Sequence, residues 1–208
     1  MSLYIGVNKL AEMKQLDEAG FAHYQQVFSH LNQVLKDKGL PTYREPDEPI
    51  AEKSRAPLKS FPYLWLHYLR WVEVQISHNP QTRLTPINDD ELRANLQDVD
   101  YVDFMDDPLI NHADNEGYYL PVDFDEVLYD KAQNQDIGSS QQLMAVLQDI
   151  ASYLGIQLVD GQLSDPEMTR LSQIIDSQQD FYREIAVWVA LFEASRLSIK
   201  YQTAIVFD

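Results

Sequence analysis

The sequence has no cysteine, only 7 glycines in 208 residues, and 16 lysines and arginines against 33 acidic side chains. Without cysteine the chain can form no disulfide, no thiolate zinc site and no iron–sulfur cluster, so oxygen or imidazole must bind any metal. The sequence also lacks a Gly-x-Ser-x-Gly elbow, a phosphate-binding glycine loop, a dinucleotide fingerprint and a His-Glu-x-x-His pair. Nucleotide cofactors and the common hydrolase sites therefore have no support, and we expect no cofactor.

Long hydrophobic runs are also missing, because no stretch approaches the roughly 18 consecutive apolar residues that a membrane-spanning helix needs. Residues 1–10 contain no basic leader followed by an apolar run, so we expect neither export nor membrane insertion and predict a cytoplasmic location. The formal net charge of −17 repels phosphate and anionic lipid. We therefore predict no nucleic-acid partner and no membrane partner.

The negative charge is concentrated in one part of the chain. Residues 86–136, which we call the acidic arm, contain 15 acidic and 2 basic residues, a net −13 of the total −17. Unpaired carboxylates cannot be buried at low cost, so these groups must be solvated, neutralised by cations or matched to a basic partner. The arm therefore favours a basic protein surface as its partner.

Periodicity predicts an α+β fold that is predominantly helical, with about five helices packed with a small sheet. Helices are expected near 16–38, 63–76, 88–96 and 139–154, and one long final helix from a capping box at 164–167 to about residue 200. The sheet is expected from the N-terminal strand 3–7, from 118–124 and from the C-terminal strand 203–207, and a brief strand at 156–159 is expected before a turn at Asp160-Gly161. Pro121 would place 118–124 at a sheet edge or a bulge.

Five of the ten prolines fall between Pro41 and Pro62, which predicts a Pro-rich loop at 40–62. We expect residues 1–208 to form a single domain that carries this loop and the acidic arm. The loop bases Arg44, Lys53, Arg55 and Lys59 could dock on the arm.

A candidate metal site lies in the arm at His112, Asp114, Glu116 and Asp123. Positions 1, 3, 5, 6 and 12 of a calcium loop would be His112, Asp114, Glu116, Gly117 and Asp123. However, a histidine then replaces the acid at position 1, and an aspartate replaces the glutamate at position 12. In an extended segment, the first three would instead project to one side and could bind a divalent transition metal. The third interpretation is a polar turn before an edge strand, in which Gly117 takes a positive φ.

The sequence supports two functions, neither with an assigned catalytic residue or oligomeric state. The first is a protein-interaction domain for a basic partner, in one version an immunity or inhibitor protein, because carboxylates beside aromatic rings suit lysine and arginine. The alternative is a metal-dependent, hydrolytic enzyme that uses the candidate metal site. The residues predicted to bind the partner are Asp103, Asp106, Asp107, Tyr118, Tyr119, Asp125 and Glu126.

Three segments, GLPTYREP at 39–46, DPLINHADNEGYYLPVDF at 107–124 and IGSSQQL at 137–143, resemble a family of bacterial proteins of about this length with no known activity. The resemblance spans most of the chain. It implies a bacterial cytosolic setting and no catalytic role.

Overall fold

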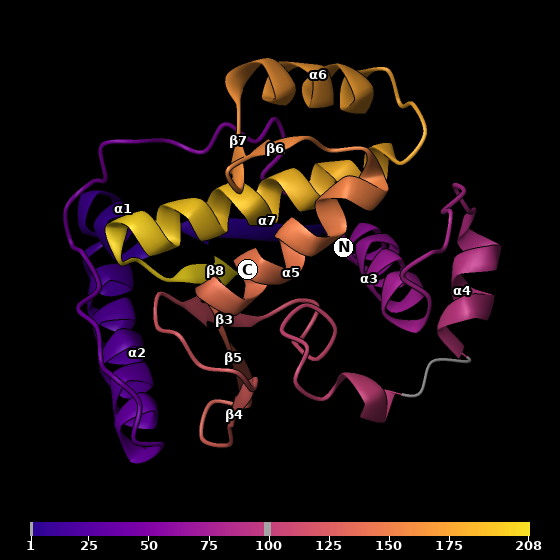
Figure 1. Ribbon diagram of the computed structural model, residues 1–208. Helices are drawn as coiled ribbons and strands as arrows, with labels where there is room; N and C mark the ends of the chain where they lie inside the picture. The colour runs from indigo at the N-terminus through magenta and orange to yellow at the C-terminus, as the bar shows by residue number, and fades with distance from the viewer. Residues whose placement is uncertain (1, 98–100) are drawn as a thin grey trace.

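The computed structural model describes residues 2–97 and 101–208 (Figure 1). Its centre is a six-stranded sheet in the order β2-β1-β8-β3-β5-β4. The N-terminal strand, the 118–120 segment and the C-terminal strand all belong to this sheet, so the predicted α+β fold is confirmed. The strands are β1 (Ser2–Val7), β2 (Ser60–Pro62), β3 (Gly117–Leu120), β4 (Leu128–Asp130), β5 (Gln135–Ser139) and β8 (Ile205–Phe207).

The helices cover both faces of this sheet. Two-residue strands, β6 (Leu158–Val159) and β7 (Gln162–Leu163), form a separate hairpin around the predicted turn at residues 160–161, and single 3-10 turns lie at η1 (Tyr101–Phe104) and η2 (Ser152–Leu154). The α-helices of the described residues are α1 (Lys9–Leu16), α2 (Glu18–Asp37), α3 (Tyr63–His78), α4 (Asp89–Gln97), α5 (Ser140–Ala151), α6 (Asp165–Asp176) and α7 (Tyr182–Tyr201).

Alternating side chains divide the core between the two faces of the sheet. Tyr119, Ile205 and Phe207 belong to a cluster with α3, α5 and α7, whereas the neighbouring residues Tyr118 and Val206 pack with α2. Helix α7 runs through the larger cluster and is buried along most of its length. The central strands are therefore apolar on both sides.

Two of the predicted elements are wrong in their details. Strand β3 ends at Leu120, one residue before Pro121, and it lies between β8 and β5 in the interior of the sheet instead of at an edge. The proline ends the strand and removes no hydrogen bond from its middle. The predicted long final helix is two helices, α6 and α7, because Gln178 and Phe181 adopt left-handed backbone conformations with φ of 50° and 61°.

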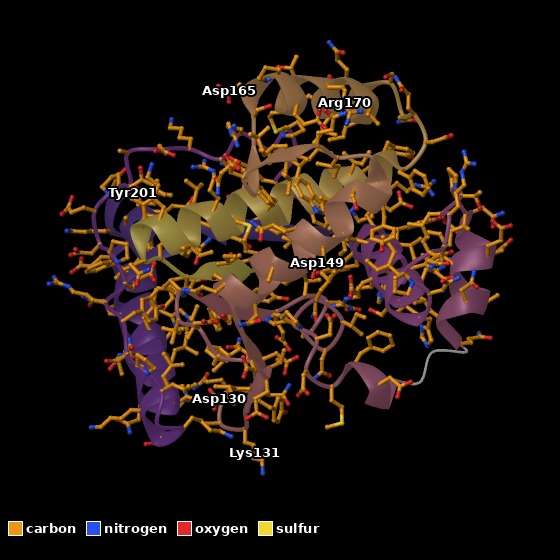
Figure 2. All side chains as sticks on the ribbon, viewed as in Figure 1. Asp130, Lys131, Asp149, Asp165, Arg170 and Tyr201 are labelled. Atoms are coloured by element: carbon orange, nitrogen blue, oxygen red, sulfur yellow. The ribbon has the colours of Figure 1, made fainter. Side chains whose placement is uncertain are left out.

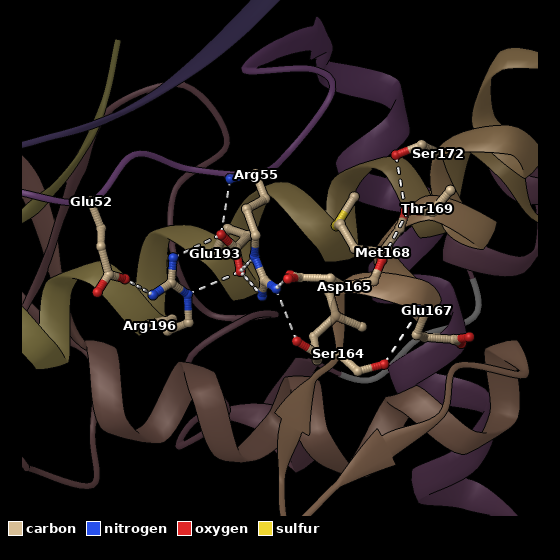
Figure 3. A network of polar contacts seen from close by, with 11 residues as sticks. Glu52, Arg55, Ser164, Asp165, Glu167, Met168, Thr169, Ser172, Glu193 and Arg196 are labelled. Atoms are coloured by element: carbon tan, nitrogen blue, oxygen red, sulfur yellow. Dashed lines mark hydrogen bonds and ion pairs between the residues drawn. The ribbon is translucent and has the colours of Figure 1, made fainter.

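The Pro-rich loop is fixed to the body of the protein, and within the described residues none of its bases forms an ion pair with the acidic arm. Arg55 donates from its backbone and its guanidinium to the fully buried Glu193 on α7, and also pairs with Asp165 (Figure 3). Glu45 accepts hydrogen bonds from Thr203 Oγ1 and from the Ala204 backbone. The predicted docking of the loop bases on the arm is therefore wrong for Arg55, because two carboxylates outside the arm bind it, the buried Glu193 and the exposed Asp165.

Among the described residues, no helix has the length and apolar character that crossing a membrane requires.

Candidate partner-binding surface

The acidic arm follows α3: its helix α4 lies at the right in Figure 1, and its strands β3, β5 and β4 run from the centre to the lower middle. It begins with α4, whose first turn has a reciprocal cap: Asn88 Oδ1 accepts from the Glu91 backbone N–H, and Glu91 Oε2 accepts from the Asn88 N–H. Leu92 is fully buried and attaches α4 to the main core. The arm then returns through η1 and a turn-rich segment to β3, and ends with the β4–β5 hairpin.

Arg70 on α3 holds the turn-rich segment in place. Its side chain is only 8% exposed, and it donates to the backbone oxygens of Leu109 and His112 at 2.7 and 2.5 Å. The same guanidinium forms an ion pair with Asp114, which His67 Nε2 also contacts at 2.9 Å. Burial acts to raise the pKa of Asp114, but the hydrogen bond from His67 and the charge of Arg70 outweigh it and lower the pKa to about 2. Asp114 therefore secures the arm to α3.

The four predicted metal ligands do not come together. His112 is buried against Tyr119, and its ring nitrogens contact the backbone oxygens of Ala113 and Tyr118. Burial lowers the pKa of His112, which favours a neutral ring. Asp123 accepts a hydrogen bond from Gln142, and Glu116 is half-buried in the turn before β3.

In the described part of the chain, no group of three or more His, Asp or Glu side chains is placed to hold a metal ion. The turn interpretation fits instead, because Gly117 has a φ of 118° and a Cβ there would lie 2.6 Å from the Asp136 backbone oxygen. The expectation that the protein needs no cofactor stays a prediction.

The two tyrosines predicted to contact a partner are core residues. Tyr118 and Tyr119 are 5% and 1% exposed, and the Tyr119 hydroxyl donates to the Pro108 backbone oxygen at 2.7 Å. They are buried because both faces of β3 are covered, which an interior strand position requires. In this structure their rings cannot contact a partner.

Several acids of the arm have structural tasks. Asp107 Oδ1 accepts from the backbone N–H groups of Leu109 and Ile110, both at 2.8 Å, so this predicted partner-binding residue instead shapes the turn. Asp136 Oδ2 accepts from the Ala113 N–H. Two further acids form ion pairs, Asp89 with Arg183 and Asp90 with Arg93, and Asp130 Oδ2 lies 2.7 Å from His30 Nε2.

Five exposed carboxylates of the arm remain, and we call them the acidic surface. Within the described residues, no lysine, arginine or histidine lies within ion-pairing distance of any of them. The acidic surface consists of Asp103, Asp106, Asp123, Asp125 and Glu126.

Four members of the acidic surface surround one hollow of about 550 Å³. The hollow brings together the segment after η1 and the loop after β3, which are separated by a complete turn and a strand. Lys38, at the end of α2, is its one basic residue. Residues lining the hollow are Lys38, Leu40, Asp106, Asp123, Phe124, Asp125, Glu126 and Leu128.

The arm's β4–β5 hairpin lies at the lower end of the molecule, as Asp130 and Lys131 show in Figure 2. Asp165 and Arg170 on α6 mark the opposite end in the same view. Asp103, Asp106, Asp125 and Glu126 of the predicted partner-binding residues are therefore on the surface, whereas Tyr118, Tyr119 and Asp107 support it from within. Sequence reasoning missed Arg70, which lies in an apolar helix some 40 residues before its partners; its charge within that apolar stretch was the available signal.

A protein-family model described as "Putative DNA-mimic protein" matches residues 1–207. No curated protein matches the chain, and no solved structure does. The match confirms the resemblance to a family without a known activity.

The family corrects two predictions. The immunity-type or inhibitor-type function is wrong, because the description of the family names imitation of DNA. The predicted partner is wrong as well. An unspecified basic protein surface is too broad a description, because a protein that imitates DNA binds a DNA-binding protein. The prediction of no nucleic-acid partner also did not consider that this protein could itself take the place of nucleic acid. The hydrolytic alternative loses its site because the four proposed ligands do not converge. Because the family model matches nearly the whole length of the chain, the chain belongs to the family described as putative DNA-mimic proteins.

Proposed function

We propose that the protein binds a DNA-binding protein by placing its acidic surface where the phosphates of DNA would lie. The family match over residues 1–207 carries this proposal. The unpaired carboxylates around the hollow support it, because four of them surround a hollow with a single basic residue, Lys38, and no base of the described residues lies within ion-pairing distance of them.

Carboxylates can replace phosphates at such a surface for a simple chemical reason. Lysine and arginine donate charge-assisted hydrogen bonds to both groups, and arginine can bind either one through two parallel N–H groups. Most of the affinity of proteins for DNA comes from contacts with the phosphate backbone, which carries about one charge per 1.7 Å of duplex. A dense set of carboxylates can therefore bind the lysines and arginines that give a DNA-binding protein the sequence-independent part of its affinity for DNA.

Rigidity of the arm supports the same proposal. Arg70 fixes the backbone at Leu109 and His112, and Asp136 fixes it at Ala113, so the segment between η1 and β3 is held at several points. A preorganised surface loses little conformational entropy when a partner binds it. We propose that the partner meets this surface in the bacterial cytoplasm, where proteins that bind DNA are found.

The test is competition with DNA. The immobilised protein is incubated with DNA-binding proteins of a bacterial lysate, and duplex DNA is then used as the eluant. Proteins that bind through their DNA sites should be released by DNA, and their retention should fall as salt rises. If duplex DNA at saturating concentration releases none of the retained proteins, the proposal is wrong.

Two variants with equal charge change locate the surface. Asp106→Asn/Asp125→Asn/Glu126→Gln removes three charges from the hollow and should weaken binding at least tenfold. Its matched control replaces three exposed acids outside the arm with asparagine: Asp160 between β6 and β7, Asp176 at the end of α6, and Asp180 before α7. This control should bind within about twofold of the original. Equal losses in both variants would show that only net charge matters.

A further inference from the structure

A second cavity, of about 350 Å³, lies between β1, α1, the Pro-rich loop and α7. No residue of the acidic arm lines it, so it is separate from the hollow described above. Its volume falls within the range of about 300–1,000 Å³ that is typical of small-molecule sites. Its size therefore suits a small molecule.

The inner wall is apolar and built from short side chains. Ala190, Ala194 and Leu197 follow one another at helical spacing along α7, and Ile5 of β1 and Ala11 of α1 close the other sides. All five side chains are buried. The alanines leave space that longer residues would fill, and the wall offers no charged group, so it suits a hydrocarbon tail.

The mouth of the cavity carries unpaired positive charge. Lys53 and Lys59 line it and are exposed, and no carboxylate of the described residues lies within ion-pairing distance of either. The two acids that line the same cavity are already paired, Glu12 with Lys9 and Glu52 with Arg196 and Lys200. In a chain with a net charge of −17, two lysines beside an apolar cavity form a local site for an anion.

The cavity wall is held in shape before any ligand arrives. Asn8 donates to the Glu48 backbone oxygen and accepts from the Ile50 N–H, which attaches the Pro-rich loop to the start of α1. Farther along the loop, Arg55 is bound to the buried Glu193 (Figure 3). A preformed apolar cavity binds a ligand without the cost of ordering its walls.

We propose that this cavity binds a small amphipathic carboxylate, with the tail against the α7 alanines and the carboxylate at Lys53 and Lys59. At about 30 Å³ for each non-hydrogen atom, the share of a water molecule in the liquid, the cavity holds roughly a dozen such atoms. A monocarboxylate with a tail of about eight carbons has this size. The proposal is independent of the acidic surface and of any DNA-binding partner.

Three ligands with eight carbons each test it: octanoate, 1-octanol and octylammonium. Each is titrated into the full-length protein, and amide chemical shifts are followed by NMR. Octanoate is expected to bind with a dissociation constant below 1 mM, 1-octanol about tenfold more weakly and octylammonium more weakly still. Equal affinities for octanoate and octylammonium, or no binding of octanoate by 10 mM, would overturn the proposal.

Substitutions assign the two ends of the ligand. Lys53→Gln/Lys59→Gln alters only exposed side chains and should reduce octanoate affinity to that of 1-octanol, without changing 1-octanol binding. The matched control, Lys36→Gln/Lys131→Gln, changes two exposed lysines that do not line the cavity and should bind octanoate like the original. Ala194→Phe fills the apolar end and should abolish binding of both ligands. If the control loses as much affinity as the lysine pair, the proposed anion site is wrong.

Discussion

Replacing Arg70 with methionine should release the acidic arm while the rest of the fold stays intact. Methionine keeps much of the side-chain volume but removes every N–H donor. The backbone oxygens of Leu109 and His112 then lose their partner, and Asp114 keeps only His67.

The size of the effect follows from these contacts. Breaking a buried ion pair by removing one partner costs about 3–5 kcal/mol, and each buried carbonyl left without a donor costs about 1–3 kcal/mol. Asp114 is 38% exposed, so water screens part of its loss. We expect about 3–4 kcal/mol of local stability to be lost, which is a roughly 100- to 1,000-fold increase in opening of the segment at about 1.36 kcal/mol per tenfold.

Hydrogen exchange measures this opening directly. Amides of residues 105–116 should exchange faster by that factor in Arg70→Met, whereas amides of β1 and α7 should change much less. Binding to a DNA-binding partner should also weaken, although all five carboxylates of the acidic surface remain. The control is Arg93→Met, because Arg93 is 65% exposed and pairs with Asp90 at 3.6 Å on the surface, which predicts a change below about 1 kcal/mol. If exchange in 105–116 is unaltered in Arg70→Met, the role assigned to Arg70 is wrong.

Three other predictions concern stability. Burial raises the pKa of Glu45, Glu73 and Glu184 to about 7, so between pH 4.5 and 7 the folded state binds more protons than the unfolded state. The free energy of unfolding should therefore fall as pH rises from about 4.5 to 7. Calorimetry that shows a higher melting temperature at pH 7 than at pH 5 would contradict this. Glu193→Gln removes the buried charge that Arg55 and Arg196 face and should cost about 2–4 kcal/mol in urea unfolding, and a change below 1 kcal/mol would refute it. Ser164→Ala removes the hydroxyl that accepts from the Glu167 N–H at the start of α6 and should cost about 1 kcal/mol by the same assay, with no loss expected from the exposed Ser152→Ala.

Local patterns in the sequence predicted much of the fold. Helices α2, α3 and α5 are long enough to show clear apolar stripes, and strands β1 and β8 stand out as short apolar runs. The break between α6 and α7 could not be seen, because apolar residues keep helical spacing across it and neither Gln178 nor Phe181 is a residue that signals a left-handed conformation.

The candidate surface was predictable as a region but not residue by residue. The excess of acids in 86–136 is visible in the sequence, whereas ion pairs such as Asp89 with Arg183 join residues far apart in the chain. Tyr118 and Tyr119 could not be recognised as core residues without knowing that helices cover both faces of β3. Composition shows only that the stretch 86–136 is acidic. Which of its carboxylates are exposed and unpaired depends on burial and on ion pairs, which only the structure shows.

The position of β8 has a consequence for biosynthesis. Strand β8 (Ile205–Phe207) pairs with β1 on one side and with β3 on the other, so these two strands join one sheet only through residues almost 200 positions after β1. Residues 205–207 must leave the ribosome before the two halves of the sheet can join, and such long-range pairing slows folding. The nascent chain therefore cannot assemble the complete sheet while residues 205–207 are still in the exit tunnel.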